Sequence, residues 1–154
     1  MKPILLALST FRQSDILVQN TIEFARQEGK NVLVLFVVDI NLERYLINSQ
    51  TIAGTHFRQT CQEELLAEYK EMADAKIEAI ASQANEAGVL CETIVVTGRF
   101  GIETVNVIRE RKPEKVILTR SKRPQWMRQL FGSPVDYITE HATCPVLEDY
   151  RMKT

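Results

Sequence analysis

Two uninterrupted apolar runs constrain the fold of this 154-residue chain most strongly. The first is Ile4–Leu8, and the second is Val32–Val38, which is rich in β-branched residues. Neither run alternates with polar residues, so both faces of each strand should be covered, as in a parallel sheet. A helix is predicted between the two strands, because Ser14 suits its N-terminal cap and Gly29 suits its C-terminal stop. A strand, a helix and a second strand of this kind form a right-handed βαβ unit.

A long amphipathic helix is predicted from about residue 57 to residue 87, with Gly88 directly after it. The positions of this helix that are not apolar are largely acidic, which is typical of a side that faces solvent. The segment 40–56 before it has two interpretations, a lid over a binding site or a partly helical flap with no ligand role. The helix positions expected to face inward are Leu65, Tyr69, Met72, Ala73, Ile77, Ile80 and Ala84.

The rest of the chain continues the alternation. A third strand near 89–96 is more polar, which favours an edge of the sheet. The helix after it should turn Ile102, Val105 and Ile108 inward. A strand at 116–118, a helix at 134–141 and a strand at 146–147 complete the pattern. The sequence therefore predicts an α/β fold, a single-domain open parallel sheet with helices on both faces. That domain spans residues 1–148, and residues 149–154 form a polar tail.

Composition excludes several classes of function. The net charge of −1 at pH 7 argues against binding of nucleic acid, which needs a basic face. No apolar run approaches the roughly 20 residues that span a bilayer, so no membrane partner is expected. Cys61, Cys91 and Cys144 are widely spaced and form no metal-ligand pattern, so no metal is expected and a cytoplasmic setting is favoured. No catalytic constellation is visible, and His141 suits a structural place in the last turn of a helix.

A basic loop follows the strand at 116–118. Arg120, Lys122, Arg123 and Arg128 place four cations in it, and it leads to Gly132-Ser133-Pro134 at the start of a helix. The N-terminus of a helix offers unpaired backbone N–H groups and partial positive charge, which suit an anion. In open α/β sheets, ligands bind beyond the carboxyl ends of the strands. The loop therefore indicates a candidate anion site.

The chain resembles the universal stress protein family over nearly all of its length. The resemblance rests on the opening strand, on Val37-Val38-Asp39, on Gly98, and above all on the stretch from Leu130 to Val146, which is close to the usual ending of the family. It implies a five-stranded sheet of order 3-2-1-4-5. It also implies a homodimer, which in many members forms through the last strand.

The resemblance also implies where this chain departs from the members that bind ATP. Those members carry two glycines where this chain has Thr119 and Lys122, and only Gly132-Ser133 of their glycine pattern is present. Their aspartate after the first strand is replaced by Ser9. A side chain in place of glycine restricts positive φ and the approach of backbone amides to phosphate.

These departures lead to a functional hypothesis. The chain is interpreted as a regulatory or protective binding protein with a degenerate nucleotide site, acting as a dimer and not as an enzyme. The alternative is a switch that binds ATP or AMP, and a third interpretation is a nucleotide-hydrolysing relative. No cofactor is assigned beyond ATP or AMP as candidates. The candidate residues for the nucleotide or anion site are Ser9, Val38, Thr119, Arg120, Lys122, Arg123, Gly132 and Ser133.

Overall fold

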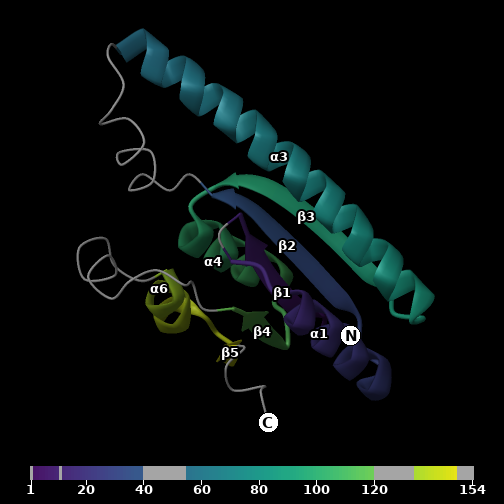
Figure 1. Cartoon of the computed structure of the whole chain (residues 1–154). Helices are drawn as coiled ribbons and strands as arrows, with labels where there is room; N and C mark the ends of the chain where they lie inside the picture. Colours follow the sequence, from purple (N-terminus) through teal and green to yellow (C-terminus); the bar gives the residue numbers. More distant parts are fainter. Residues whose placement is uncertain (1, 11, 40–54, 120–133, 149–154) are drawn as a thin grey trace.

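The computed structural model describes residues 2–10, 12–39, 55–119 and 134–148, with side chains in the third range described from residue 63 onward. Strands and helices alternate along the described chain, as predicted (Figure 1). The elements are β1 (Ile4–Ser9), α1 (Asp15–Glu28), β2 (Val32–Asp39), α3 (Thr55–Glu86), β3 (Cys91–Gly98), α4 (Phe100–Arg111), β4 (Lys115–Leu118), α6 (Pro134–His141) and β5 (Val146–Glu148).

The five strands form one parallel sheet in the order β3-β2-β1-β4-β5, which confirms the expected fold class and strand order. β1 is the central strand, and Ile4 pairs with Val32 of β2 on one side and with Lys115 of β4 on the other. β3 lies at one edge, as its polar sequence predicted, and β5 lies at the other. The carboxyl ends of all five strands therefore meet at the same end of the sheet.

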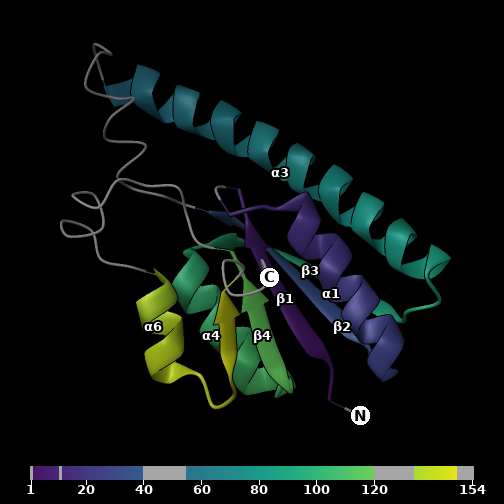
Figure 2. The ribbon, with the colours of Figure 1, turned by 60° about the horizontal axis from the view of Figure 1, so that its bottom comes forward.

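Alternate residues of the central strands supply two separate cores. In β1, Leu6 points to the face covered by α1 and α3, and Ala7 points to the face covered by α4 and α6. Figure 2 shows the sheet between these two pairs of helices. Every residue of β1 and β2 is buried, which is why their sequences show no polar alternation.

The ends of α1 are fixed by the residues that the sequence indicated. The Ser14 hydroxyl accepts a hydrogen bond from the Leu17 N–H at 3.2 Å, which satisfies one of the unpaired donors of the first turn. Gly29 adopts a left-handed conformation with φ of 63°, which costs glycine little. These caps place β2 beside β1 after a short connection.

Two side chains predicted to face inward are exposed instead. Met72 of α3 is 55% exposed, because the buried stripe runs through its neighbour Ala73 and continues to Ile77 and Ile80. Ile102 of α4 is 42% exposed. The buried residues of α4 are Phe100, Gly101, Thr104, Val105, Val107 and Ile108. Both predictions were wrong because an apolar residue next to the buried stripe of a helix also fits an approximate helical spacing.

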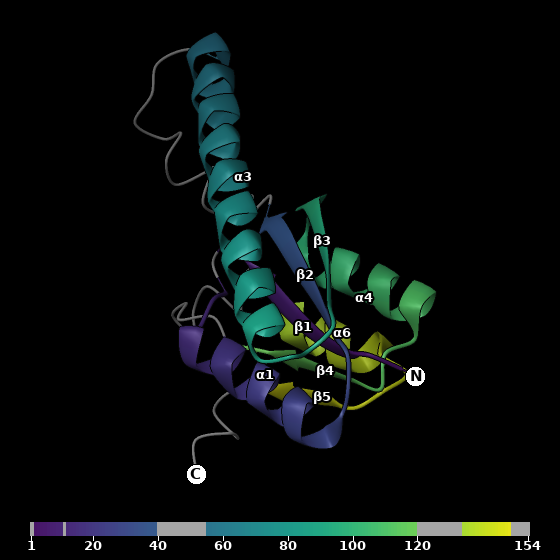
Figure 3. The ribbon, with the colours of Figure 1, turned by 90° about the vertical axis from the view of Figure 1, so that its right-hand side faces the viewer.

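α3 is longer than the sheet that it covers. Its 32 residues extend about 48 Å at 1.5 Å per residue, whereas the 8 residues of β3 extend about 26 Å. Figure 3 shows the N-terminal part of α3 projecting beyond the ends of the strands. No helix within the described residues has the length and apolar composition needed to cross a membrane. The segment 40–56, interpreted as a lid or as a partly helical flap, lies outside the described residues, except that α3 begins at Thr55.

The two-sided burial of β1 makes a testable prediction. Leu6→Ala should lower the free energy of unfolding by about 3 kcal/mol, because Leu6 is fully buried in the centre of the sheet. Ile16→Ala is the matched control, since Ile16 is 65% exposed and its loss should change stability by less than about 0.5 kcal/mol. Urea unfolding of both variants measures the difference, and equal costs would contradict the described core.

Candidate functional site

Polar side chains gather where β1, β2 and β4 end. Ser9 is the last residue of β1, Asp39 is the last residue of β2, and Thr119 follows β4 directly. All three are buried, with exposed fractions of 0%, 8% and 5%. These residues are far apart in the sequence. Because the strands are parallel neighbours, their carboxyl ends lie together, and the three residues meet at one end of the sheet. Ligands of open α/β sheets bind at this end.

The chain after β1 is tied to the end of β2. Ser9 and Arg12 exchange two backbone hydrogen bonds of 3.1 Å, so the chain reverses within a short turn. The Thr10 N–H donates to the Val37 carbonyl at 3.2 Å, and the Thr10 hydroxyl accepts from the Asp39 N–H at 3.3 Å. This turn is therefore held as part of the sheet end and not as an open loop.

Arg12 is the residue of this region that the sequence interpretation missed. It is only 4% exposed, although arginine is rarely buried unless it is paired. One of its guanidinium nitrogens, Nη1, donates to the Thr119 carbonyl at 3.3 Å. The guanidinium carbon lies 5.2 Å from the centre of the Phe100 ring on α4, within the range of a cation–π contact. The signal in the sequence was a cation close behind a fully apolar strand.

The structure brings together only part of the predicted set of site residues. Ser9 and Thr119 lie at the same end of the sheet, and Arg12 contacts both through backbone or side-chain hydrogen bonds. The Val38 side chain is buried in the core beneath α1 and α3 and so faces away from the α4 side on which Arg12 lies. The predicted residues Arg120, Lys122, Arg123, Gly132 and Ser133 lie outside the described residues, and so does Arg128.

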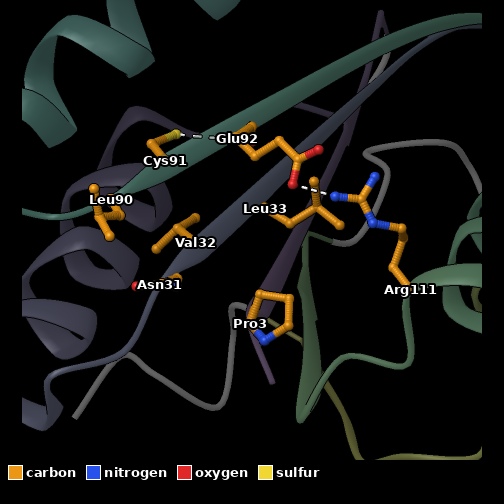
Figure 4. Close-up of a pocket in the computed structure, with 8 residues that line it drawn as sticks. All are labelled: Pro3, Asn31, Val32, Leu33, Leu90, Cys91, Glu92 and Arg111. Atoms are coloured by element: carbon orange, nitrogen blue, oxygen red, sulfur yellow. Dashed lines mark hydrogen bonds and ion pairs between the residues drawn. The ribbon is translucent and has the colours of Figure 1, made fainter. Parts of the chain in front are cut away.

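A pocket of about 350 Å³ lies at the opposite end of the sheet, near the amino ends of the strands. Figure 4 shows Glu92 and Arg111 pointing toward one another across it, and they form an ion pair. Because both side chains are partly exposed, this pair adds little stability. Burial raises the pKa of the Cys91 thiol in the same pocket, so Cys91 is less readily ionised than a free cysteine. The pocket lies apart from the polar groups at the carboxyl ends. Its lining residues are Pro3, Asn31, Val32, Leu33, Leu90, Cys91, Glu92 and Arg111.

His141 has the structural surroundings that its position predicted. It is in the last turn of α6, and its Nδ1 donates to the Tyr137 carbonyl at 2.8 Å. Its ring also lies 4.2 Å from the Tyr137 ring, centre to centre. Within the described ranges, no group of three His, Cys, Asp or Glu side chains could hold a metal ion.

Comparison with solved structures shows what this fold is similar to. Universal stress protein UspA from Lactobacillus plantarum superposes with a TM-score of 0.68 at 16% identity, covering 96% of this chain and 97% of that protein. A universal stress protein from Archaeoglobus fulgidus, in complex with dAMP, has a TM-score of 0.58 at 16% identity, with 96% and 97% coverage. A universal stress protein in complex with cAMP has a TM-score of 0.55 at 13% identity, with 96% and 95% coverage.

The sequence comparison is independent of these superpositions. No curated protein sequence matches the chain. Residues 1–147, however, match the universal stress protein family, which is nearly the whole length. The five-stranded order, the polar sheet end and this match agree, and the chain belongs to the universal stress protein family.

Proposed function

We propose that this chain is a regulatory or protective binding protein with a degenerate nucleotide site, and that it acts as a homodimer. The observation that carries the proposal is the buried group at the carboxyl ends of β1 and β4. Thr119 places a side chain directly after β4, where the family resemblance implies glycine in members that bind ATP. Ser9, fully buried, stands where those members have aspartate.

Each replacement weakens a different part of a nucleotide site. A Cβ at position 119 restricts the backbone conformations and the close amide approach that glycine allows. A serine hydroxyl is a weaker acceptor than a carboxylate for the hydroxyl or amine groups of a nucleoside. The ligand class that remains is an adenine nucleotide bound weakly, or a small anion.

A second candidate function is a switch in which occupancy by ATP or AMP changes segment 40–56 and the choice of partner. It is favoured by the two similar proteins solved with dAMP and cAMP. The two candidates differ in affinity, since the switch requires tight binding by the unmodified chain and the degenerate site does not.

We also propose that the chain is non-catalytic and cytoplasmic. His141, the one histidine whose side chain is described, is engaged with the carbonyl of its own helix, which supports a structural role. Cys91 and Cys144 are free thiols, which supports a reducing compartment. Incubation with ATP followed by product analysis tests the third interpretation, hydrolysis. ADP or AMP formed in large molar excess over the protein would overturn the non-catalytic assignment.

The proposed nucleotide site can be tested by a substitution at Lys122. Lys122→Gly should tighten ATP binding about tenfold, or ~1.4 kcal/mol, because glycine restores the backbone freedom that a phosphate loop needs. Isothermal titration calorimetry measures the change. Lys112→Gly is the matched control, since it removes the same side chain after α4, at the opposite end of the sheet, from a position with φ of 48° that glycine adopts easily. Unchanged ATP affinity in Lys122→Gly would count against side-chain bulk as the obstacle.

The proposed dimer can be tested in the same way, and we place its interface at the outer edge of β5. The Val116 N–H donates to the Pro145 carbonyl, and Val116 pairs with Val146. In a parallel ladder, N–H groups alternate in direction, so the Glu148 N–H faces away from β4. β5 is the last strand in the sheet order, and an edge strand can pair with a strand of a second copy of the chain.

Glu148→Pro removes this outward N–H and leaves in place the N–H groups of β5 that face β4. It should convert a dimer into a folded monomer in sedimentation experiments. Glu148→Ala keeps the N–H while removing the side chain, and it should remain a dimer. The assignment to β5 fails if Glu148→Pro sediments as the unmodified chain does, or if the unmodified chain is a monomer.

A further inference from the structure

The point where the strand order reverses lies between β1 and β4. The chain builds β2 and β3 on one side of β1, then crosses to build β4 and β5 on the other side. At such a point the connections leave the sheet end in opposite directions, and the crevice between them is where an open α/β sheet receives its ligand. In this chain, Ser9 ends β1 and Thr119 follows β4 at that point of the sheet.

Arg12 lies at the carboxyl ends of β1 and β4. The two backbone hydrogen bonds between Ser9 and Arg12 turn the chain back over the end of β1. From there the Arg12 side chain reaches across to β4, where Nη1 contacts the Thr119 carbonyl at 3.3 Å. Arg12 thus links the ends of the paired strands β1 and β4, through its backbone at Ser9 and through its guanidinium at Thr119.

The side chain is enclosed as well as positioned. Arg12 is 4% exposed, and the Phe100 ring against which its guanidinium lies is 1% exposed. A buried guanidinium is stable only where hydrogen bonds and favourable electrostatics replace its water, and the Thr119 carbonyl and the Phe100 ring face contribute to both. The Arg12 side chain is therefore a packed part of the sheet end, not a mobile surface cation.

Resting on the proposed function, we propose that Arg12 is a specificity-determining residue that keeps nucleosides out of this site. Its side chain lies across the carboxyl ends of β1 and β4, so a nucleoside binds there only when the guanidinium leaves Thr119 and Phe100. The excluded class is the nucleoside part of an adenine nucleotide. The volume of the Arg12 side chain excludes the nucleoside. This effect is separate from that of Thr119 and Lys122, which stand where the members that bind ATP have glycine.

Two substitutions at one position separate volume from charge. Arg12→Ala removes both, whereas Arg12→Met removes the charge and keeps a long side chain that fills most of the space. The probe is adenosine, which is neutral, so loss of a cation does not itself alter its attraction to the site. Calorimetric titration should show Arg12→Ala binding adenosine at least tenfold more tightly than the unmodified chain, and Arg12→Met binding within twofold of it. Adenosine affinity unchanged in Arg12→Ala, or raised equally in both variants, would overturn the proposal.

Thermal unfolding establishes that each variant is folded before titration. Arg12→Ser replaces Arg12→Ala if the latter unfolds, since its hydroxyl is small and can still donate a hydrogen bond. The proposed function is tested separately by ATP titration of the unmodified chain and of Lys122→Gly. Tight ATP binding by the unmodified chain rejects the degenerate site. Tighter binding in Lys122→Gly, with no gain in Arg12→Ala, keeps the degenerate site and rejects the role of Arg12.

Discussion

The burial of both faces of β1 and β2 is the constraint on which the rest of this structure depends. Every residue of these strands is buried, so their side chains are almost entirely apolar and helices must cover the sheet from both sides. Polar groups then have no place along the strands and collect where the strands end. Ser9, Asp39 and Thr119 mark that boundary, and the parallel arrangement brings them to one end of the sheet.

The same constraint decides what the sheet end can bind. A parallel sheet whose order reverses between β1 and β4 creates a crevice, and the residues that follow these strands determine its contents. In this chain a tight turn after β1 returns Arg12 to the carboxyl end of the sheet, where its guanidinium lies against Thr119 and Phe100. The scaffold of the family is preserved, whereas Ser9 and Thr119 differ from the residues that the resemblance implies for members that bind ATP. Family membership accordingly establishes the fold more firmly than the ligand.

Features that depend on local sequence could be predicted well. Ser14 and Gly29 indicated both ends of α1, and the polar character of β3 indicated its edge position. The strand order came from the family resemblance, because βαβ alternation alone does not specify it. The inward orientation predicted for Met72 and Ile102 was wrong, because an approximate helical spacing also fits an apolar residue next to the buried stripe. Arg12 was missed because its burial depends on contacts with α4 and β4, distant in sequence, and the residues of the basic loop stay predictions.

The central claim is that this chain keeps the family scaffold without a tight nucleotide site. Native mass spectrometry of the protein, purified without added nucleotide, tests this claim most directly, because a tight ligand survives purification. The account predicts the mass of the polypeptide assembly alone, with no stoichiometric ATP or AMP released on denaturation. One adenine nucleotide retained per chain would contradict it.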